Sequence, residues 1–153
     1  MTVSQIIHFL ATSLAAGLIG GAAMEFVMWS ITRSGWAKAD MLVALGSLVT
    51  GTRDNAWRVG AIIHASSACV FGMIYTLILL SIEMTGMPEA MMIGLGMGFV
   101  HGMLVSLILV WVVADNHPLE EFASASFAVG VAHLAGHVAF GGLVGFIVGV
   151  LPL

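Results

Sequence analysis

The sequence predicts an all-α membrane protein, a bundle of four transmembrane helices with a short interfacial or re-entrant helix between the first and the second. The chain of 153 residues is 60% hydrophobic and only 8% charged, whereas soluble domains carry roughly 25% charged residues. Its apolar residues form four long segments, 6–32, 56–81, 88–114 and 122–151. Each is longer than the ~20 residues that a bilayer core requires. We therefore expect one transmembrane domain over residues 1–153, with the lipid bilayer as its solvent.

The connection between the first two segments carries the additional short helix. Within residues 38–51, apolar side chains recur at helical spacing, at Met41, Leu42, Leu45, Leu48 and Val49. This stretch is too short to cross a membrane, so it is expected to lie at the interface or to re-enter the bilayer shallowly.

The positions of the basic residues predict the orientation. All four of them, Arg33, Lys38, Arg53 and Arg58, lie in or beside the 33–58 connection. The positive-inside rule places this connection in the cytoplasm, so both termini are expected to be external. The net charge of −4 gives no electrostatic basis for binding nucleic acid.

Small residues and ionisable residues share the same helix faces. Residues four apart lie on one face of a helix, and faces of small residues allow helices to approach closely in lipid. Such faces run through all four segments, at Gly17, Gly21 and Glu25; Gly60, His64, Ala68 and Gly72; Gly94, Gly98 and Gly102, beside His101; and His133, His137, Gly141, Gly145 and Gly149. We expect these faces to point into the bundle.

Five ionisable residues form the predicted site: Glu25, His64, His101, His133 and His137. A charged side chain at the centre of a lipid-facing helix costs about 2.5–3.5 kcal/mol on insertion scales, so an interior position is favoured. Two arrangements are compatible with their positions. Either Glu25 pairs with His64 while the other three histidines form a second cluster, or all five converge on one elongated site.

Three chemistries fit these residues. All five are candidate ligands of a transition-metal ion such as copper, iron or zinc, because imidazole and carboxylate suit these metals. His101, His133 and His137 are candidate cofactor ligands, with His101 and either of the other two as the axial pair of a b-type haem. The third chemistry is a proton or ion path along the histidines and Glu25. We predict no catalytic residue.

Several stretches resemble a known group of proteins. They are GLIGGAAMEFVMW, KADMLVALGSLVTG, RVGAIIHASSACVFGMIYTLIL, GMGFVHGMLV and GHVAFGGLVGFIVGVL. In this order they resemble a family of small prokaryotic four-helix integral membrane proteins. The resemblance implies a four-helix fold in the inner or plasma membrane of a prokaryote, and it carries no activity and no site residue.

The leading functional hypothesis is an accessory subunit of a larger membrane complex, of redox type, that holds an intramembrane metal ion or haem. We expect no catalytic activity from the chain alone, and we expect other membrane subunits, or further copies of the chain, as its partners. One alternative is a proton-coupled transporter or channel that uses the histidines and Glu25 as a relay. Another is a purely structural subunit whose histidines form hydrogen bonds only.

The predicted orientation can be tested with reporter fusions. A periplasmic reporter joined after Leu153 is expected to be active and a cytoplasmic reporter at the same point inactive, because the basic residues hold the 33–58 connection inside. A reporter inserted near Gly51 is expected to give the opposite pattern. Activity of the cytoplasmic reporter after Leu153 would reverse the orientation and leave the number of spans unchanged.

Overall fold

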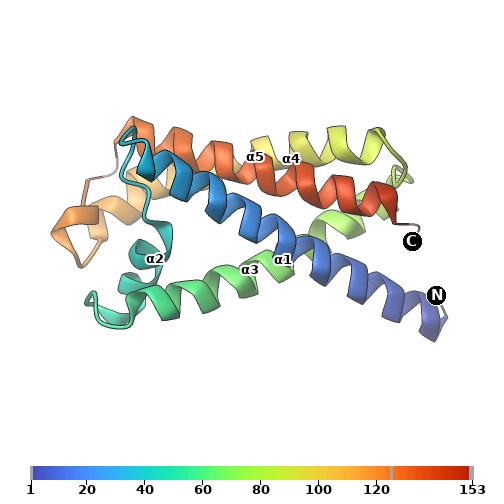
Figure 1. Cartoon of the computed structure of the whole chain (residues 1–153), viewed down its shortest axis with the longest axis horizontal. Helices are drawn as coiled ribbons and strands as arrows, with labels where there is room; N and C mark the ends of the chain where they lie inside the picture. Colours follow the sequence, from blue (N-terminus) through green and yellow to red (C-terminus); the bar gives the residue numbers. More distant parts are fainter. Residues whose placement is uncertain (1, 125, 152–153) are drawn as a thin grey trace.

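The computed structural model describes residues 2–124 and 126–151 and confirms the predicted fold class. Four of its helical segments are long and apolar enough to cross a membrane: Val3–Arg33, Ala56–Ser81, Glu89–Asn116 and Phe127–Val150. They correspond to α1 (Val3–Arg33), α3 (Ala56–Ser81), α4 (Glu89–Ile108) with its extension, and α5 (Phe127–Val150). The short helix α2 (Met41–Thr50) lies between α1 and α3, as predicted. The two termini lie at one end of the bundle and α2 lies at the other (Figure 1).

The ends of the last two spans are defined by local hydrogen bonding. After α4 the chain continues as one turn of π-helix, η1 (Leu109–Val113), and a 3-10 turn, η2 (Ala114–Asn116). The last span was predicted at about residues 122–151, and α5 itself begins at Phe127. Ser126 caps its first turn by accepting a hydrogen bond from the Val129 N–H, and a serine oxygen in this position satisfies a donor that the helix leaves unpaired. Residues Glu120–Phe122 form a separate 3-10 turn, η3.

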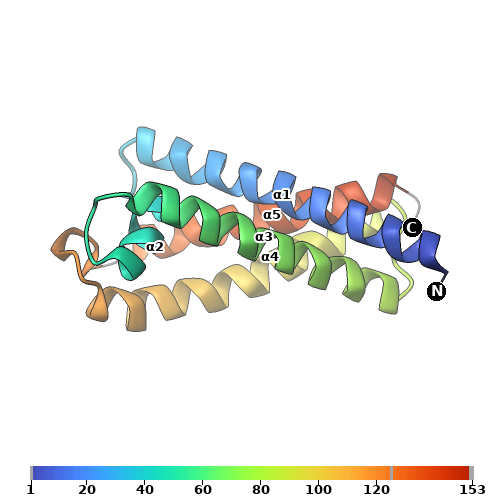
Figure 2. The same ribbon diagram turned by 90° about the horizontal axis from the view of Figure 1, so that it is seen from below.

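The helices form two closely packed pairs joined through α5. Helix α5 packs along α4 and along α1, and α1 in turn packs on α3. Helices α3 and α4, by contrast, have little contact with each other. Figure 2 shows α3 and α4 separating toward the α2 end of the molecule. Helix α2 packs on α3 at this end.

Glycines set the two close pairings. A methyl group on Gly98 would collide with the His137 carbonyl oxygen of α5, and one on Gly141 would collide with the Gly94 carbonyl of α4. A methyl group on Gly17 of α1 would likewise meet the Ala68 carbonyl of α3. The backbones therefore touch directly, which in lipid replaces the hydrophobic effect as the source of helix association. The glycine faces of α1 and α4 are thus used within one chain.

Helix α2 is part of the bundle rather than a surface attachment. It begins where the Asp40 carboxylate accepts a hydrogen bond from the Val43 N–H and ends at Gly51, whose φ of 69° lies in the left-handed region that suits glycine. Its Met41, Leu42, Gly46 and Ser47 are buried. A methyl group on Gly46 would collide with the Ala56 carbonyl of α3. The α2 backbone is therefore pressed against α3.

Two glycines on α4 provide a matched test of this packing. Gly98→Ala is expected to lower the free energy of unfolding by about 1–3 kcal/mol, the usual cost of overpacking, because its methyl group meets the α5 backbone. Gly96→Ala meets nothing within 4 Å and is expected to be neutral or to stabilise by up to about 1 kcal/mol through helix propensity. Unfolding of both variants in mixed micelles, titrated with a denaturing detergent, measures the difference. Equal stabilities would contradict the α4–α5 contact.

Candidate functional site

A cavity of about 640 Å³ occupies the space that α3 and α4 leave between them. Helices α1 to α5 and the 114–126 connection all contribute to its lining. Five histidines line it, His64, His101, His117, His133 and His137, and we call it the histidine cavity. Its apolar lining includes Phe71, Val105, Ile108 and Phe140, while Lys38, Asp40 and Glu121 add charged groups toward the α2 end.

His133 and His137 come from α5 and are held in one tautomer by the helix itself. The Nδ1 of His133 lies 2.9 Å from the Val129 carbonyl oxygen, and the Nδ1 of His137 lies 2.8 Å from the His133 carbonyl oxygen. A carbonyl oxygen only accepts, so each Nδ1 carries the hydrogen and donates it. Each neutral ring then keeps its lone pair on Nε2, the form in which imidazole binds a metal. The exposed fractions of the two residues are 4% and 7%.

His101, from α4, lies in an aromatic cluster. Its ring centroid is 4.1 Å from that of Phe71 and 4.6 Å from that of His137, to which it is nearly perpendicular. Its Nδ1 lies 3.2 Å from the Tyr75 hydroxyl oxygen. Tyr75 did not emerge from the sequence as a site residue, although it is the only tyrosine in the chain. The sequence feature that could have identified Tyr75 is its position three residues after Gly72, which places it on the interior face of α3.

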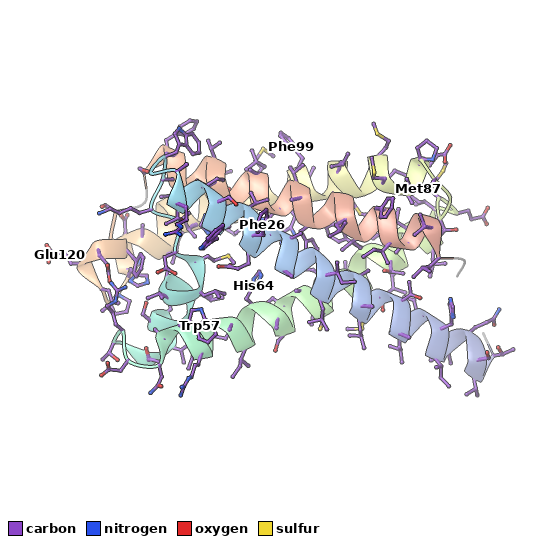
Figure 3. All side chains as sticks on the ribbon, viewed as in Figure 1. Phe26, Trp57, His64, Met87, Phe99 and Glu120 are labelled. Atoms are coloured by element: carbon purple, nitrogen blue, oxygen red, sulfur yellow. The ribbon has the colours of Figure 1, made fainter. Side chains whose placement is uncertain are left out.

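His64 joins α3 to α1. Its Nε2 lies 3.2 Å from the Gly21 carbonyl oxygen, so Nε2 donates and the lone pair of the neutral ring is on Nδ1. Figure 3 shows His64 rising from α3 toward α1. Of the five predicted residues, His64, His101, His133 and His137 thus line one cavity. Glu25 does not line it and lies instead in a second, smaller cavity that also contacts His64.

The described residues contain no preformed metal-ion centre. Within residues 2–124 and 126–151, no group of three or more His, Cys, Asp or Glu side chains is arranged to hold a metal ion. The four histidines of the predicted set therefore share a cavity without converging on one point. Such an arrangement offers single imidazole ligands rather than a complete coordination shell.

His117 closes the α2 end of the histidine cavity, a role that the sequence did not indicate. Its Nε2 donates to the Ala44 carbonyl oxygen of α2 at 3.0 Å, and its Nδ1 accepts from the Leu119 N–H at 3.1 Å. Close by, Arg53 and Glu121 form an ion pair, with 2.6 Å between Nη1 and Oε2. These contacts tie the 114–126 connection to α2 and to the loop that follows it. Both nitrogens of His117 are occupied, so it is not a ligand candidate.

Comparison with known proteins identifies no family for this chain. No family model, no curated protein and no solved structure matches it. The four long apolar helices support a small four-helix membrane protein, and the resemblance noted above goes no further than that architecture.

Replacing His117 tests whether this residue holds the α2 end together. In His117→Ala the Ala44 carbonyl loses the donor from the 114–126 connection and keeps the Ser47 hydroxyl, and the loss of one such hydrogen bond costs about 0.5–1.5 kcal/mol. We expect faster amide hydrogen exchange in residues 41–50 and unchanged exchange in the middle of α5. The matched control is Glu120→Ala, on the same connection but exposed, and it should leave exchange in α2 unchanged. Unaltered exchange in His117→Ala would show that α2 is held by its glycine contacts alone.

Proposed function

We propose that this protein holds a b-type haem in the histidine cavity and acts as an accessory subunit of a larger membrane redox assembly. The observation that carries this proposal is the cavity itself. Its volume of about 640 Å³ falls within the range of roughly 300–1,000 Å³ that is typical of ligand and cofactor sites. It also contains imidazoles whose Nε2 lone pairs are set by hydrogen bonds from Nδ1 to the backbone.

A haem suits this cavity better than a bare metal ion does. An ion bound by protein side chains needs several of them grouped together, and the described residues contain no such group. The porphyrin supplies four ligands of its own, so one axial imidazole suffices to hold the iron. The apolar walls formed by Phe71, Val105, Ile108 and Phe140 are suited to the faces of a porphyrin.

Within the cavity, His133 is the best candidate for the axial ligand. The rings of His101 and His137 are 4.6 Å apart and meet edge to face, so they leave no space for a porphyrin plane between them. They therefore cannot form the expected axial pair without moving apart. His133 lies one turn nearer the α2 end, and among the described residues no aromatic ring stacks on it. Its hydrogen bond to the Val129 carbonyl orients the ring and increases the basicity of Nε2.

The accessory role follows from how little polypeptide lies between the spans. The connections consist of α2 with its flanking turns, residues 82–88, and the 117–126 stretch. A bound haem would supply one-electron transfer, and the electron donor and acceptor would be other subunits of the membrane assembly. The Glu25 carboxylate and His64 are not part of this ligand set.

The experiment is a visible spectrum of the protein purified from its native membrane, with binding of added haem to the purified protein as a second measurement. We expect a Soret band in the wild type and its loss in His133→Ala, because the iron loses its axial nitrogen. His8→Ala is the matched control, since His8 is exposed on α1 and does not line the cavity. It should keep the band.

Circular dichroism should show that all three proteins keep their helices. Wild-type protein that is colourless and binds no added haem would end this proposal and favour a proton relay or a purely structural role. A band that survives in His133→Ala and is lost in His137→Ala would identify His137, one helical turn away, as the ligand. The haem proposal would then still hold.

A further inference from the structure

A second cavity of about 230 Å³ lies between α1 and α3, bordered by Leu42 of α2. Most of its lining is small or apolar, from Leu18, Gly21, Ala22, Leu42, Ala61, Ala65 and Ala68, and its two ionisable groups are Glu25 and His64. Leu18 and Ala22 are exposed on the outer surface of the bundle, so this crevice is reached from the bilayer. We call it the Glu25 crevice.

Glu25 has an unsatisfied carboxyl oxygen in this apolar setting. Its Oε2 is buried and, within the described residues, is the only buried side-chain nitrogen or oxygen that lacks a hydrogen-bond partner. The charged and titratable groups that face Glu25 are His64 on α3 and Asp40 at the start of α2. The histidines of α5, the other helix packed on α1, line the histidine cavity instead. An ionised carboxylate here would be a desolvated charge without a cationic partner, which is strongly unfavourable.

His64 connects the Glu25 crevice to the histidine cavity. It is the one titratable side chain among the described residues that lines both. Because its Nε2 donates to the Gly21 carbonyl, the lone pair of the neutral ring is on Nδ1, the nitrogen that can accept a proton. A carboxylic acid and an imidazole are the groups that membrane proteins use to move protons through the bilayer.

We infer that Glu25 and His64 form a proton-binding pair, in which Glu25 holds a proton within the bilayer and His64 links it to the histidine cavity. Glu25 and His64 line one crevice, and a proton transferred from the Glu25 oxygen to Nδ1 of His64, once the two side chains come within hydrogen-bond distance, would leave a carboxylate beside an imidazolium, so the pair would stay neutral overall. The pair needs no haem, so this inference is tested independently of the proposed function.

The test is chemical labelling of the protein in liposomes with dicyclohexylcarbodiimide, an apolar reagent that reacts with protonated carboxyl groups. The acid O–H adds across one C=N bond of the reagent, and the acyl group then migrates from oxygen to nitrogen. The resulting stable N-acylurea contains all the atoms of both reactants. Mass spectrometry of the peptide that contains Glu25 should find this adduct at neutral pH. Labelling should fall about tenfold per pH unit above its midpoint, as for a single titrating group.

Two variants and one internal reference complete the design. Glu25→Gln should lose the label, and Glu120, which is exposed on the 114–126 connection, should remain unlabelled because the apolar reagent concentrates in the bilayer. His64→Gln retains an N–H donor for the Gly21 carbonyl but cannot accept the proton. It should therefore shift the midpoint for labelling of Glu25 to higher pH.

Wild-type Glu25 that is unlabelled at every pH would overturn the proton site. A midpoint unchanged in His64→Gln would overturn the pairing with His64. Labelling of Glu25 in a protein that never shows a Soret band would uphold this inference and refute the haem proposal. A Soret band with unlabelled Glu25 would do the reverse.

Discussion

Direct backbone contact along the glycine faces is the interaction on which the rest of this structure depends. Lipid is as apolar as leucine, so helices in a bilayer associate through close packing and polar contacts rather than through the hydrophobic effect. Glycines of α4 and α5 face each other's carbonyl groups, and Gly17 of α1 meets the backbone of α3. No such pairing joins α3 to α4, which have little contact. The close pairs leave an opening on one side, and the histidine cavity lies there.

Helix α2 keeps that opening from collapsing. Its Gly46 and the Gly60 of α3 each face backbone atoms of the other helix, so α2 is fixed at the end where α3 and α4 diverge (Figure 2). His117 and the Arg53–Glu121 ion pair then fasten the 114–126 connection over the same end. An apolar space inside a bundle loses packing contacts. Its persistence here reflects a short helix inserted between the spans.

Burying the histidines in this interior costs little free energy because the backbone forms a hydrogen bond with one nitrogen of nearly every ring. His64, His133 and His137 each donate to a carbonyl oxygen, and His101 bonds to Tyr75. Each bond also decides which nitrogen keeps its lone pair. Glu25 is different, because one of its carboxyl oxygens has no partner among the described residues. The polar interior therefore divides into neutral imidazoles around one cavity and an acid beside another, with His64 between them.

The sequence by itself determined the class, the number of spans, the short helix after the first span and the inward faces of the histidines. These follow from composition and from the 3.6-residue period, which are local properties of the chain. It left open whether Glu25 lies with His64 apart from the other histidines. It could not separate α3 from α4, or show that His117 and Tyr75 contribute to the site. Those features depend on which glycine face pairs with which, and a stripe of small residues does not specify its partner. Only the tertiary structure decided that α5 packs on both α1 and α4 and that the space left between α3 and α4 becomes a cavity.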